Sequence, residues 1–393
     1  MTQPLDPSPH AAHDLPPGTR VAFDDAINRI RYRVEVTLAD GRPGFPHYAE
    51  SKFGTWTRSP AGDWTGGFWV GELWLLARVT GEAHLLDAAH DWSRRLEDRV
   101  EDDTIFRGFL FWYGSALGSL LLDDSEAANR AVSAGRALDR SFNRAAGLMP
   151  LGNSAEEASD VGPEATNIDG VPGATPLLAW AGARTRDDGL RIDAQRHAHQ
   201  HAALCVRDDG SVCQSAIFDP ATGHLVRRYT HKGFSDQSTW ARAQTWAMLG
   251  FAQAARWTDY EIFLPIARTV ADWYVDHLPP DGVTYWDFDA PQVRSTGLDT
   301  SAASIGAASL LKLAALDPTR SEGYLHTAVR SLTSLTTAHL TPIGDGILPP
   351  GMLLHGCYNH RIDLAVDHEL IWGDYFLLEA LLAVTGRLDT SEL

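Results

Sequence analysis

The segment from His231 to Trp246, HKGFSDQSTWARAQTW, combines basic, amide and indole side chains within sixteen positions. Indole rings cover the apolar face of a sugar ring, and Arg and Gln side chains donate hydrogen bonds to carboxylate and hydroxyl oxygens. We therefore predict that this segment forms one wall of a sugar-binding site. Considered without its context, its pair of Trp residues is more typical of an ordinary helical core.

A catalytic acid is predicted at Asp169, in the segment NIDGVPGA. Asp is also a favoured helix N-cap, so capping is the alternative role for every acid near a helical run. Asp169 differs because Gly170 and Pro172 would leave its carboxylate open to a cavity. Desolvation among aromatic rings favours the neutral carboxyl, which keeps a general acid protonated near neutral pH. The other acidic candidates are Asp63, Asp236, Asp299, Asp367 and Asp374.

Other kinds of catalytic centre have little support in the sequence. The run HAHQH at 197–201 has the HxxxH spacing of a metal site, but it lies on an amphipathic segment with no companion acid nearby. Nucleophile elbows, GxGxxG loops and phosphate-binding loops are absent from the sequence. We therefore expect neither a metal nor a cofactor.

The composition argues against several kinds of partner and location. The 393 residues carry 51 acids and 33 bases, and the formal charge of −18 would repel nucleic acid and anionic membranes. Three cysteines without zinc-ligand spacing indicate reduced thiols in a cytoplasmic protein. Residues 1–20 lack a secretory signal and are expected to form a disordered tail. No stretch approaches the roughly eighteen apolar residues of a membrane span, and the oligomeric state stays open.

Helical runs of two kinds alternate along the chain. Six compact runs rich in Gly and Ala are 66–81, 108–124, 169–183, 240–258, 299–317 and 372–386. Six amphipathic runs are 24–38, 84–100, 128–143, 192–206, 261–278 and 324–340. Small side chains favour tight packing around an axis, so the compact runs are expected inside and the amphipathic runs outside. This pattern predicts an all-α (α/α)6 barrel of six helical hairpins over residues 21–393, with an open helical solenoid as the alternative.

Two segments between the helical runs have strand signals. The first is a predicted β-hairpin at 211–230, around a Pro-Ala-Thr-Gly turn, and the second is a short strand at 282–289. Both are expected at the barrel rim. The loops that join outer to inner helices would gather at one end of the barrel and contain the chemistry-bearing residues.

Five motifs resemble the unsaturated glucuronyl hydrolases of glycoside hydrolase family 88. They are DWTGGFWVGELWL, NIDGVPGATPLLAWA, HKGFSDQSTWARAQTWA, DTSAASIGAASLLKL and LLHGCYNHRIDLAVDHELIWGDYFLLEALL, in this order over about positions 45 to 390. The resemblance implies an (α/α)6 barrel that acts on oligosaccharides left by polysaccharide lyases. It also implies hydration of the C4=C5 double bond of a terminal unsaturated uronic acid. An Asp protonates C4 and directs water to C5, and the hemiketal opens and releases the neighbouring sugar.

The resemblance also assigns roles to individual residues. It implies that Asp169 is the general acid/base, that Trp240, Arg242 and Trp246 contact the uronate, and that Trp64 is the first aromatic platform. The complete set of predicted substrate-binding residues is Trp64, Arg107, Gln214, His231, Trp240, Arg242, Gln244, Trp246, His355 and Tyr358.

The chain departs from the family pattern in the segment TIFRGF. Family members usually carry a His-Asp pair before a Gly-Phe, whereas Phe106 and Arg107 stand in this place here, without the second carboxylate. Gly66 replaces an Asn of the family pattern, and Gln214 stands where a His is expected. Arg107 could provide a cation for a substrate anion or pair with the acids at 101–103. Two alternatives stay open: a divergent enzyme for another sugar or natural-product glycoside, and a non-catalytic carbohydrate-binding barrel.

Overall fold

The computed structural model describes residues 15–291, 297–344, 348–390 and 393. Residues 1–14 of the predicted tail lie outside the described residues. Helix α1 (Pro17–Ala39) begins at Pro17, within the range 1–20 that we assigned to the tail. Proline suits this position because its fixed φ matches a helix and the first turn needs no amide hydrogen from it.

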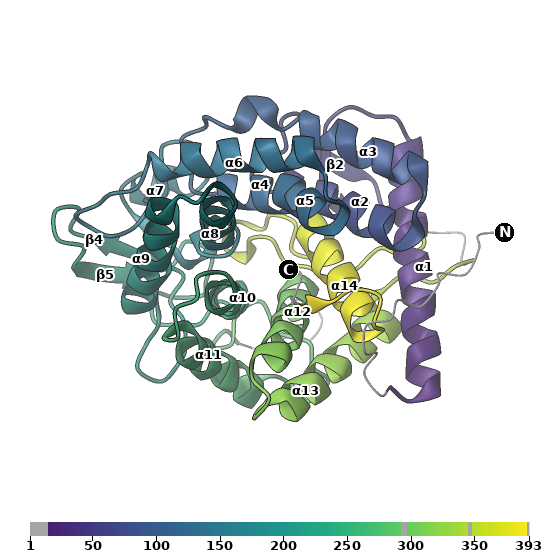
Figure 1. Ribbon diagram of the computed structural model, residues 1–393. Helices are drawn as coiled ribbons and strands as arrows, with labels where there is room; N and C mark the ends of the chain where they lie inside the picture. Colours follow the sequence, from purple (N-terminus) through teal and green to yellow (C-terminus); the bar gives the residue numbers. More distant parts are fainter. Residues whose placement is uncertain (1–14, 292–296, 345–347, 391–392) are drawn as a thin grey trace.

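The described helices form two concentric rings (Figure 1). The inner ring consists of α2 (Gly66–Thr80), the consecutive α4 (Arg107–Phe111), η2 (Trp112–Ala116) and α5 (Leu117–Leu122), α8 (Ala174–Thr185), α10 (Ala241–Trp257), α12 (Thr300–Leu316) and α14 (Ile371–Val384). The outer ring consists of α1, α3 (Ala83–Arg94), α6 (Ser125–Asp139), α9 (Asp188–Cys205), α11 (Phe263–His277) and α13 (Ser321–Ser334). Helix α14 packs against α2, which closes the inner ring. The predicted (α/α)6 barrel is therefore confirmed, and the open solenoid is not the architecture of this chain.

Burial follows the difference between the two kinds of helical run. Helix α10 is buried on all sides from Ala241 to Ala254. Helix α3 buries one stripe, with Leu85, Ala89 and Trp92 at helical spacing. The compact runs thus supply the core of the barrel, and the amphipathic runs cover it.

Two small antiparallel sheets lie in the connections between helices. One has the order β3 (Thr166–Asn167), β4 (Ser215–Phe218), β5 (Leu225–Tyr229), and its β4–β5 hairpin confirms the prediction for 211–230. The other has the order β2 (Trp56–Ser59), β1 (Phe45–Glu50), β6 (His368–Leu370). The sequence did not predict it, because strands this short show little alternation. The strand predicted at 282–289 does not form; this segment pairs through isolated bridges instead.

Two expectations about membranes and thiols can be compared with the structure. Among the described residues, no helix is both long and apolar enough to cross a membrane. The three cysteines, Cys205, Cys213 and Cys357, are buried and free.

A buried acidic cluster lies at the start of α14, where strand β6 leads into this helix. Glu72, Glu369 and Asp374 are buried around a single base, Arg33, whose Nε lies 2.9 Å from Oε1 of Glu369. Burial raises the pKa of Glu72 and of Asp374 well above their usual values. Protonated carboxyls are therefore favoured here, because one guanidinium cannot balance three buried negative charges.

Replacing Glu72 by Gln is expected to change how stability depends on pH. The folded state holds the Glu72 proton more tightly than the unfolded state, so wild-type stability falls as pH rises above 4.5, the ordinary pKa of a Glu side chain. Gln has no proton to lose in this pH range, so the variant does not lose this stability. Its free energy of unfolding, relative to that of wild type, should increase by up to about 1.4 kcal/mol for each unit by which the pH rises. Urea unfolding between about pH 5 and pH 8 measures the difference, with the exposed Glu164→Gln as control. A difference that stays constant with pH would contradict this account.

Candidate active site

Asp169 is presented to the barrel interior by a short 3-10 turn, η3 (Ile168–Gly170), that follows strand β3. The strand is fixed before the turn begins, because Ser215 Oγ donates to Asn167 Oδ1 at 2.6 Å and the Ile168 amide donates to the Gln214 carbonyl at 2.9 Å. Two adjacent hydrogen bonds leave the backbone little freedom. The carboxyl of Asp169 is therefore positioned by the sheet rather than by a flexible loop.

The backbone that follows this turn packs closely against the start of α4. Gly173 has φ +87°, and a Cβ there would lie 2.8 Å from Gly108 C. A Cβ on Gly108 would in turn lie 2.4 Å from the amide nitrogen of Ala174. Both positions need glycine, because the start of α4 and the start of α8 meet backbone to backbone. This contact fixes Phe106 and Phe109 beside Asp169.

Two histidines of the HAHQH run, His197 and His201, form hydrogen bonds with residues on either side of Asp169. His197 Nδ1 accepts a hydrogen bond from the Met149 amide at 3.1 Å, so its Nε2 carries the hydrogen and donates to the Gly170 carbonyl at 3.2 Å. His201 contacts Thr166 Oγ1 through Nε2 at 2.5 Å. The HxxxH spacing therefore places two histidines against the backbone that carries Asp169.

Asp169 lines a narrow cavity in the barrel interior. Aromatic rings make up much of its wall, and its polar groups are few. The lining residues are Trp64, Phe106, Phe109, Glu157, Asp169, Lys232, Trp240, Arg242 and Trp246. The free space inside this cavity is only about 10 Å³, so the aromatic rings enclose the carboxyl closely.

The carboxyl of Asp169 is tuned for proton transfer. Burial, and after it the negative charge of Glu157, raises its pKa to about 7, although Lys232 and Arg242 oppose the rise. Asp169 Oδ1 is buried and has no hydrogen-bond partner among the described residues. A carboxyl in this state can donate a proton and accept one again at neutral pH.

Lys232 brings a buried cation to the cavity. Gln214 Oε1 accepts hydrogen bonds from the backbone amides of His231 and Lys232, at 2.9 and 2.8 Å, and so fixes the turn that carries the lysine. The Lys232 Nζ lies 3.0 Å from Glu157 Oε1 and 3.4 Å from Glu156 Oε2. Burial alone would lower the pKa of Lys232, but the two carboxylates raise it, so the ammonium stays charged.

Arg242 ties the barrel core to the 357–358 loop. Its guanidinium bonds to Asp299 and to the backbone carbonyls of Cys357 and Tyr358, and it lies 4.4 Å from the ring centroid of Trp240. Asp299 also caps α12, because its Oδ1 accepts from the amides of Ser301 and Ala302. Capping, the alternative role that we gave to each acidic candidate, is thus the role of Asp299.

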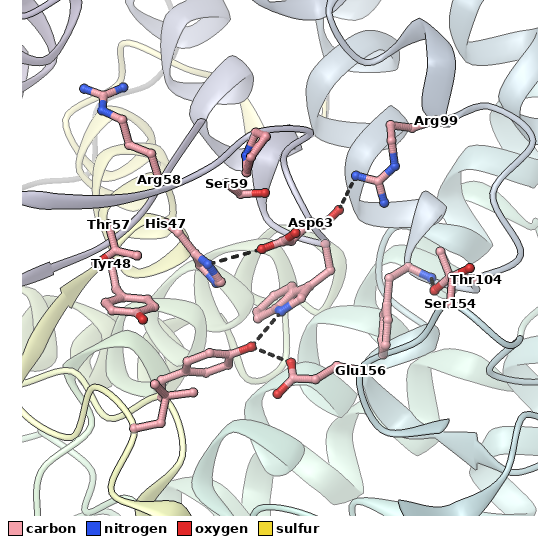
Figure 2. Close-up of a pocket in the computed structure, with 15 residues that line it drawn as sticks. His47, Tyr48, Thr57, Arg58, Ser59, Asp63, Arg99, Thr104, Ser154 and Glu156 are labelled. Atoms are coloured by element: carbon pink, nitrogen blue, oxygen red, sulfur yellow. Dashed lines mark hydrogen bonds and ion pairs between the residues drawn. The ribbon is translucent and has the colours of Figure 1, made fainter. Parts of the chain in front are cut away.

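A wider cavity opens beside the Asp169 cavity and shares Trp64 and Phe106 with it. Figure 2 shows side chains that line it, among them Glu156 and Asp63. The Tyr358 hydroxyl accepts a hydrogen bond from Trp64 Nε1 at 3.1 Å and donates one to the Glu156 carboxylate. His47 Nδ1 lies 3.5 Å from Asp63 Oδ2 on the opposite side (Figure 2). The inner and outer cavities therefore adjoin at the rings of Trp64 and Phe106.

Known proteins resemble this chain over most of its length. No family model matches the chain. An unsaturated glucuronyl hydrolase from Bacillus sp. (strain GL1) is 33% identical over 359 residues, covering 87% of this chain and 92% of that protein. An unsaturated chondroitin disaccharide hydrolase from Streptococcus pneumoniae is 29% identical over 387 residues, covering 95% of this chain and 95% of that protein. A solved structure of an unsaturated glucuronyl hydrolase with dGlcA-Glc-Rha-Glc is 30% identical, with a TM-score of 0.84 and coverage of 92% of this chain and 96% of that one.

This chain belongs to the unsaturated glucuronyl hydrolase family. It is a glycoside hydrolase, as the motifs of the sequence predicted. Of the predicted site residues, the structure brings Asp169, Trp64, Trp240, Arg242 and Trp246 to one cavity of the hydrolase. Tyr358 lines the adjoining outer cavity.

Three predicted binding residues of the hydrolase lie away from the Asp169 cavity. Gln244 Nε2 donates to the carbonyls of Gly210 and Val270, at 3.0 and 2.9 Å, because a residue two positions after Arg242 faces the other side of α10. Arg107 donates to the carbonyls of Thr104 and Val100, at 3.1 and 2.8 Å, so it neither reaches the cavity nor forms the ion pair that we considered. His355 Nδ1 lies 2.8 Å from His339 Nδ1.

Two other predicted binding residues, Gln214 and His231, lie close to the Asp169 cavity but do not line it. Gln214 is buried, and its Oε1 supports the turn at Lys232, as described above. His231 Nδ1 lies 2.5 Å from Asp160 Oδ2 and lines a neighbouring cavity with Glu156 and Arg361.

Sequence reasoning missed two charged residues of the hydrolase cavity, Glu157 and Lys232. Lys232 stood in the segment that we singled out, but it was not chosen as a binding residue. Glu157 lies in the irregular segment NSAEEASDV, which has no periodicity and no motif. Only the pairing of the two side chains, which no sequence spacing encodes, reveals their role.

Proposed function

We propose that this hydrolase acts on a terminal 4,5-unsaturated uronic acid, with Asp169 as general acid/base. The observation that carries the proposal is the Asp169 carboxyl, enclosed by aromatic rings beside the outer cavity of about 540 Å³. Its pKa is raised to about 7, and its Oδ1 has no hydrogen-bond partner within the described residues. The partly buried ring of Trp64, which lines both cavities, offers an apolar surface for the sugar. The relatives' names, unsaturated glucuronyl hydrolase and unsaturated chondroitin disaccharide hydrolase, support the substrate class.

The proposed reaction conserves the Asp169 proton over one turnover. The neutral carboxyl donates its proton to C4, and the resulting positive charge spreads over C5 and the ring oxygen. The Asp169 carboxylate then takes a proton from the water that bonds to C5, which restores the acid. The hemiketal at C5 opens by breaking the bond between C5 and the ring oxygen, and the hemiacetal that remains at C1 expels the neighbouring sugar. A positioned acid of this kind contributes about two to four powers of ten in rate.

With the unsaturated sugar at Asp169, its neighbouring sugar would occupy the adjoining outer cavity, whose charges favour a neutral sugar. Asp63 and Glu156 line this cavity. Its two arginines are already engaged, since Arg58 donates to the Gly44 carbonyl and to Asp40, both at 3.0 Å, and Arg99 donates to the Ala61 and Asp63 carbonyls at 2.7 and 3.0 Å. A sulfate group here would meet carboxylates rather than free cations.

Unsulfated disaccharides are therefore expected to be better substrates than sulfated ones. We predict that kcat/KM for an unsulfated unsaturated disaccharide exceeds that for its 6-sulfated counterpart by roughly tenfold or more, a difference of about 1.4 kcal/mol or more. Loss of the absorbance of the double bond measures both rates under identical conditions. Equal rates, or faster loss with the sulfated substrate, would contradict the charge argument.

The substrate class itself can be tested with a panel of lyase products. Unsaturated disaccharides or oligosaccharides from hyaluronan, chondroitin, heparin, gellan and ulvan are incubated with the protein, and the absorbance of the double bond is followed. We expect at least one of them to lose this absorbance. Binding without any loss of absorbance would favour a non-catalytic carbohydrate-binding barrel.

A further inference from the structure

Glu157 brings a second carboxylate into the Asp169 cavity. Its side chain is buried, and its Oε1 lies 3.0 Å from Lys232 Nζ. Its Oε2 has no hydrogen-bond partner among the described residues, and the same holds for Asp169 Oδ1. Both residues line the same narrow cavity.

The unpaired oxygens of Glu157 and Asp169 are free to bond to a water or a ligand. A buried polar atom without a partner costs about 1 to 3 kcal/mol, so folded proteins usually satisfy each one. Lys232 has carboxylates on two sides, Glu157 and Glu156, and all three groups meet at the junction of the inner and outer cavities. The wall formed by α4 and the residues before it contributes only rings there, Phe106 and Phe109. Glu157 is thus the only acid beside Asp169 that lines this cavity within the described residues.

We propose that Glu157, held by Lys232, is the second carboxylate of this active site and the positioning residue that keeps the proton on Asp169. This inference rests on the proposed role of Asp169. Glu157 comes from the segment that precedes strand β3, and no family motif that we recognised in the sequence includes it. Glu157 provides negative charge next to the acid, and Lys232 fixes its direction.

The charges of Glu157 and Lys232 shift the pKa of Asp169 in opposite directions. Glu157 raises the pKa of Asp169, whereas Lys232 and Arg242 lower it. Helix α9 adds His197 and Cys205; burial lowers the pKa of His197 and raises that of the Cys205 thiol, so both stay uncharged near neutral pH. Removing Glu157 or Lys232 must therefore move the Asp169 titration in opposite directions.

The test compares pH profiles of kcat/KM, which report the ionisations of the free enzyme. Because Asp169 must be protonated to act, wild-type activity falls as pH rises through about 7. Glu157→Gln should move this falling limb to lower pH by about one unit, and Lys232→Gln should move it to higher pH by a similar amount. Glu156→Gln, which also removes a partner of Lys232, should move the limb by less than Glu157→Gln does.

The opposite directions separate positioning from a general loss of structure. A merely damaged variant loses activity at every pH and leaves the midpoint of the limb in place. Unchanged midpoints in both variants would overturn the inference. If Glu157→Gln does not fold, as judged by thermal unfolding, Lys232→Gln alone decides, because a midpoint that stays or falls contradicts the inference.

Failure of this inference differs from failure of the proposed function. If Asp169→Asn abolishes activity while both midpoints stay at the wild-type value, Asp169 keeps its role and Glu157 loses the role proposed here. If Asp169→Asn remains active, the proposed function itself is wrong, and the inference falls with it.

Discussion

Asp169→Asn is expected to lower kcat/KM by about two to four powers of ten with the fold intact. The amide keeps the size of the carboxyl but cannot donate the proton that C4 requires. Stability should change little, because burial already favours the neutral form of Asp169 and Asn adds no charge. Loss of the double-bond absorbance under substrate-limiting conditions gives the rate, and circular dichroism confirms the fold.

A second carboxylate from the same end of the barrel serves as the control for this variant. Asp367 is exposed and is absent from the linings of the inner and outer cavities. Asp367→Asn is expected to keep kcat/KM within about threefold of wild type, since surface substitutions away from a site have small effects. Comparable losses in both variants would show that Asp169 has no special role.

Arg242→Met is expected to lower the free energy of unfolding by about 3 to 5 kcal/mol. The methionine fills much of the same volume, but Asp299 would lose its guanidinium partner while still buried at the start of α12. The carbonyls of Cys357 and Tyr358 would lose their donors as well. Urea unfolding measures the loss, and a decrease below about 1 kcal/mol, the worth of an exposed pair, would contradict this account.

A double-mutant cycle separates the buried ion pair from the packing of Arg242. Asp299→Asn keeps an N-cap side chain for α12 but removes the charge. Arg242→Met together with Asp299→Asn should therefore be less destabilising than the sum of the two single variants, by at least about 1 kcal/mol. Additive effects would mean that the pair contributes nothing beyond its separate contacts. Arg242→Lys should recover little, because an ammonium cannot reach Asp299 and two carbonyls in the guanidinium geometry.

The barrel could be predicted from the sequence because its signal is repeated. Six compact runs and six amphipathic runs each carry a helical period over ten or more residues, and such a pattern survives errors at individual positions. The sheet of β2, β1 and β6 could not be predicted, because the pairing of Tyr48 with Leu370 joins segments more than three hundred residues apart. The interruption of the second inner helix by a π-helical turn at Trp112–Ala116 has no sequence signal either.

The site was predictable where one segment contains several of its groups. Trp240, Arg242 and Trp246 share one helix start, and the structure brings them to the cavity of Asp169. Gln244 belongs to the same segment, but the helical period turns it to the opposite side. The partnership of Glu157 with Lys232 joins two irregular segments, whose relative position depends on the whole barrel.

The most direct measurement of the central claim is proton NMR of an unsaturated disaccharide incubated with the enzyme in D2O. We expect the alkene proton signal to disappear at the rate at which the neighbouring sugar is released, with deuterium delivered to C4. Asp169→Asn should stop both changes together. Release of the neighbouring sugar while the alkene signal remains would contradict hydration of the double bond and the role of Asp169 as its acid.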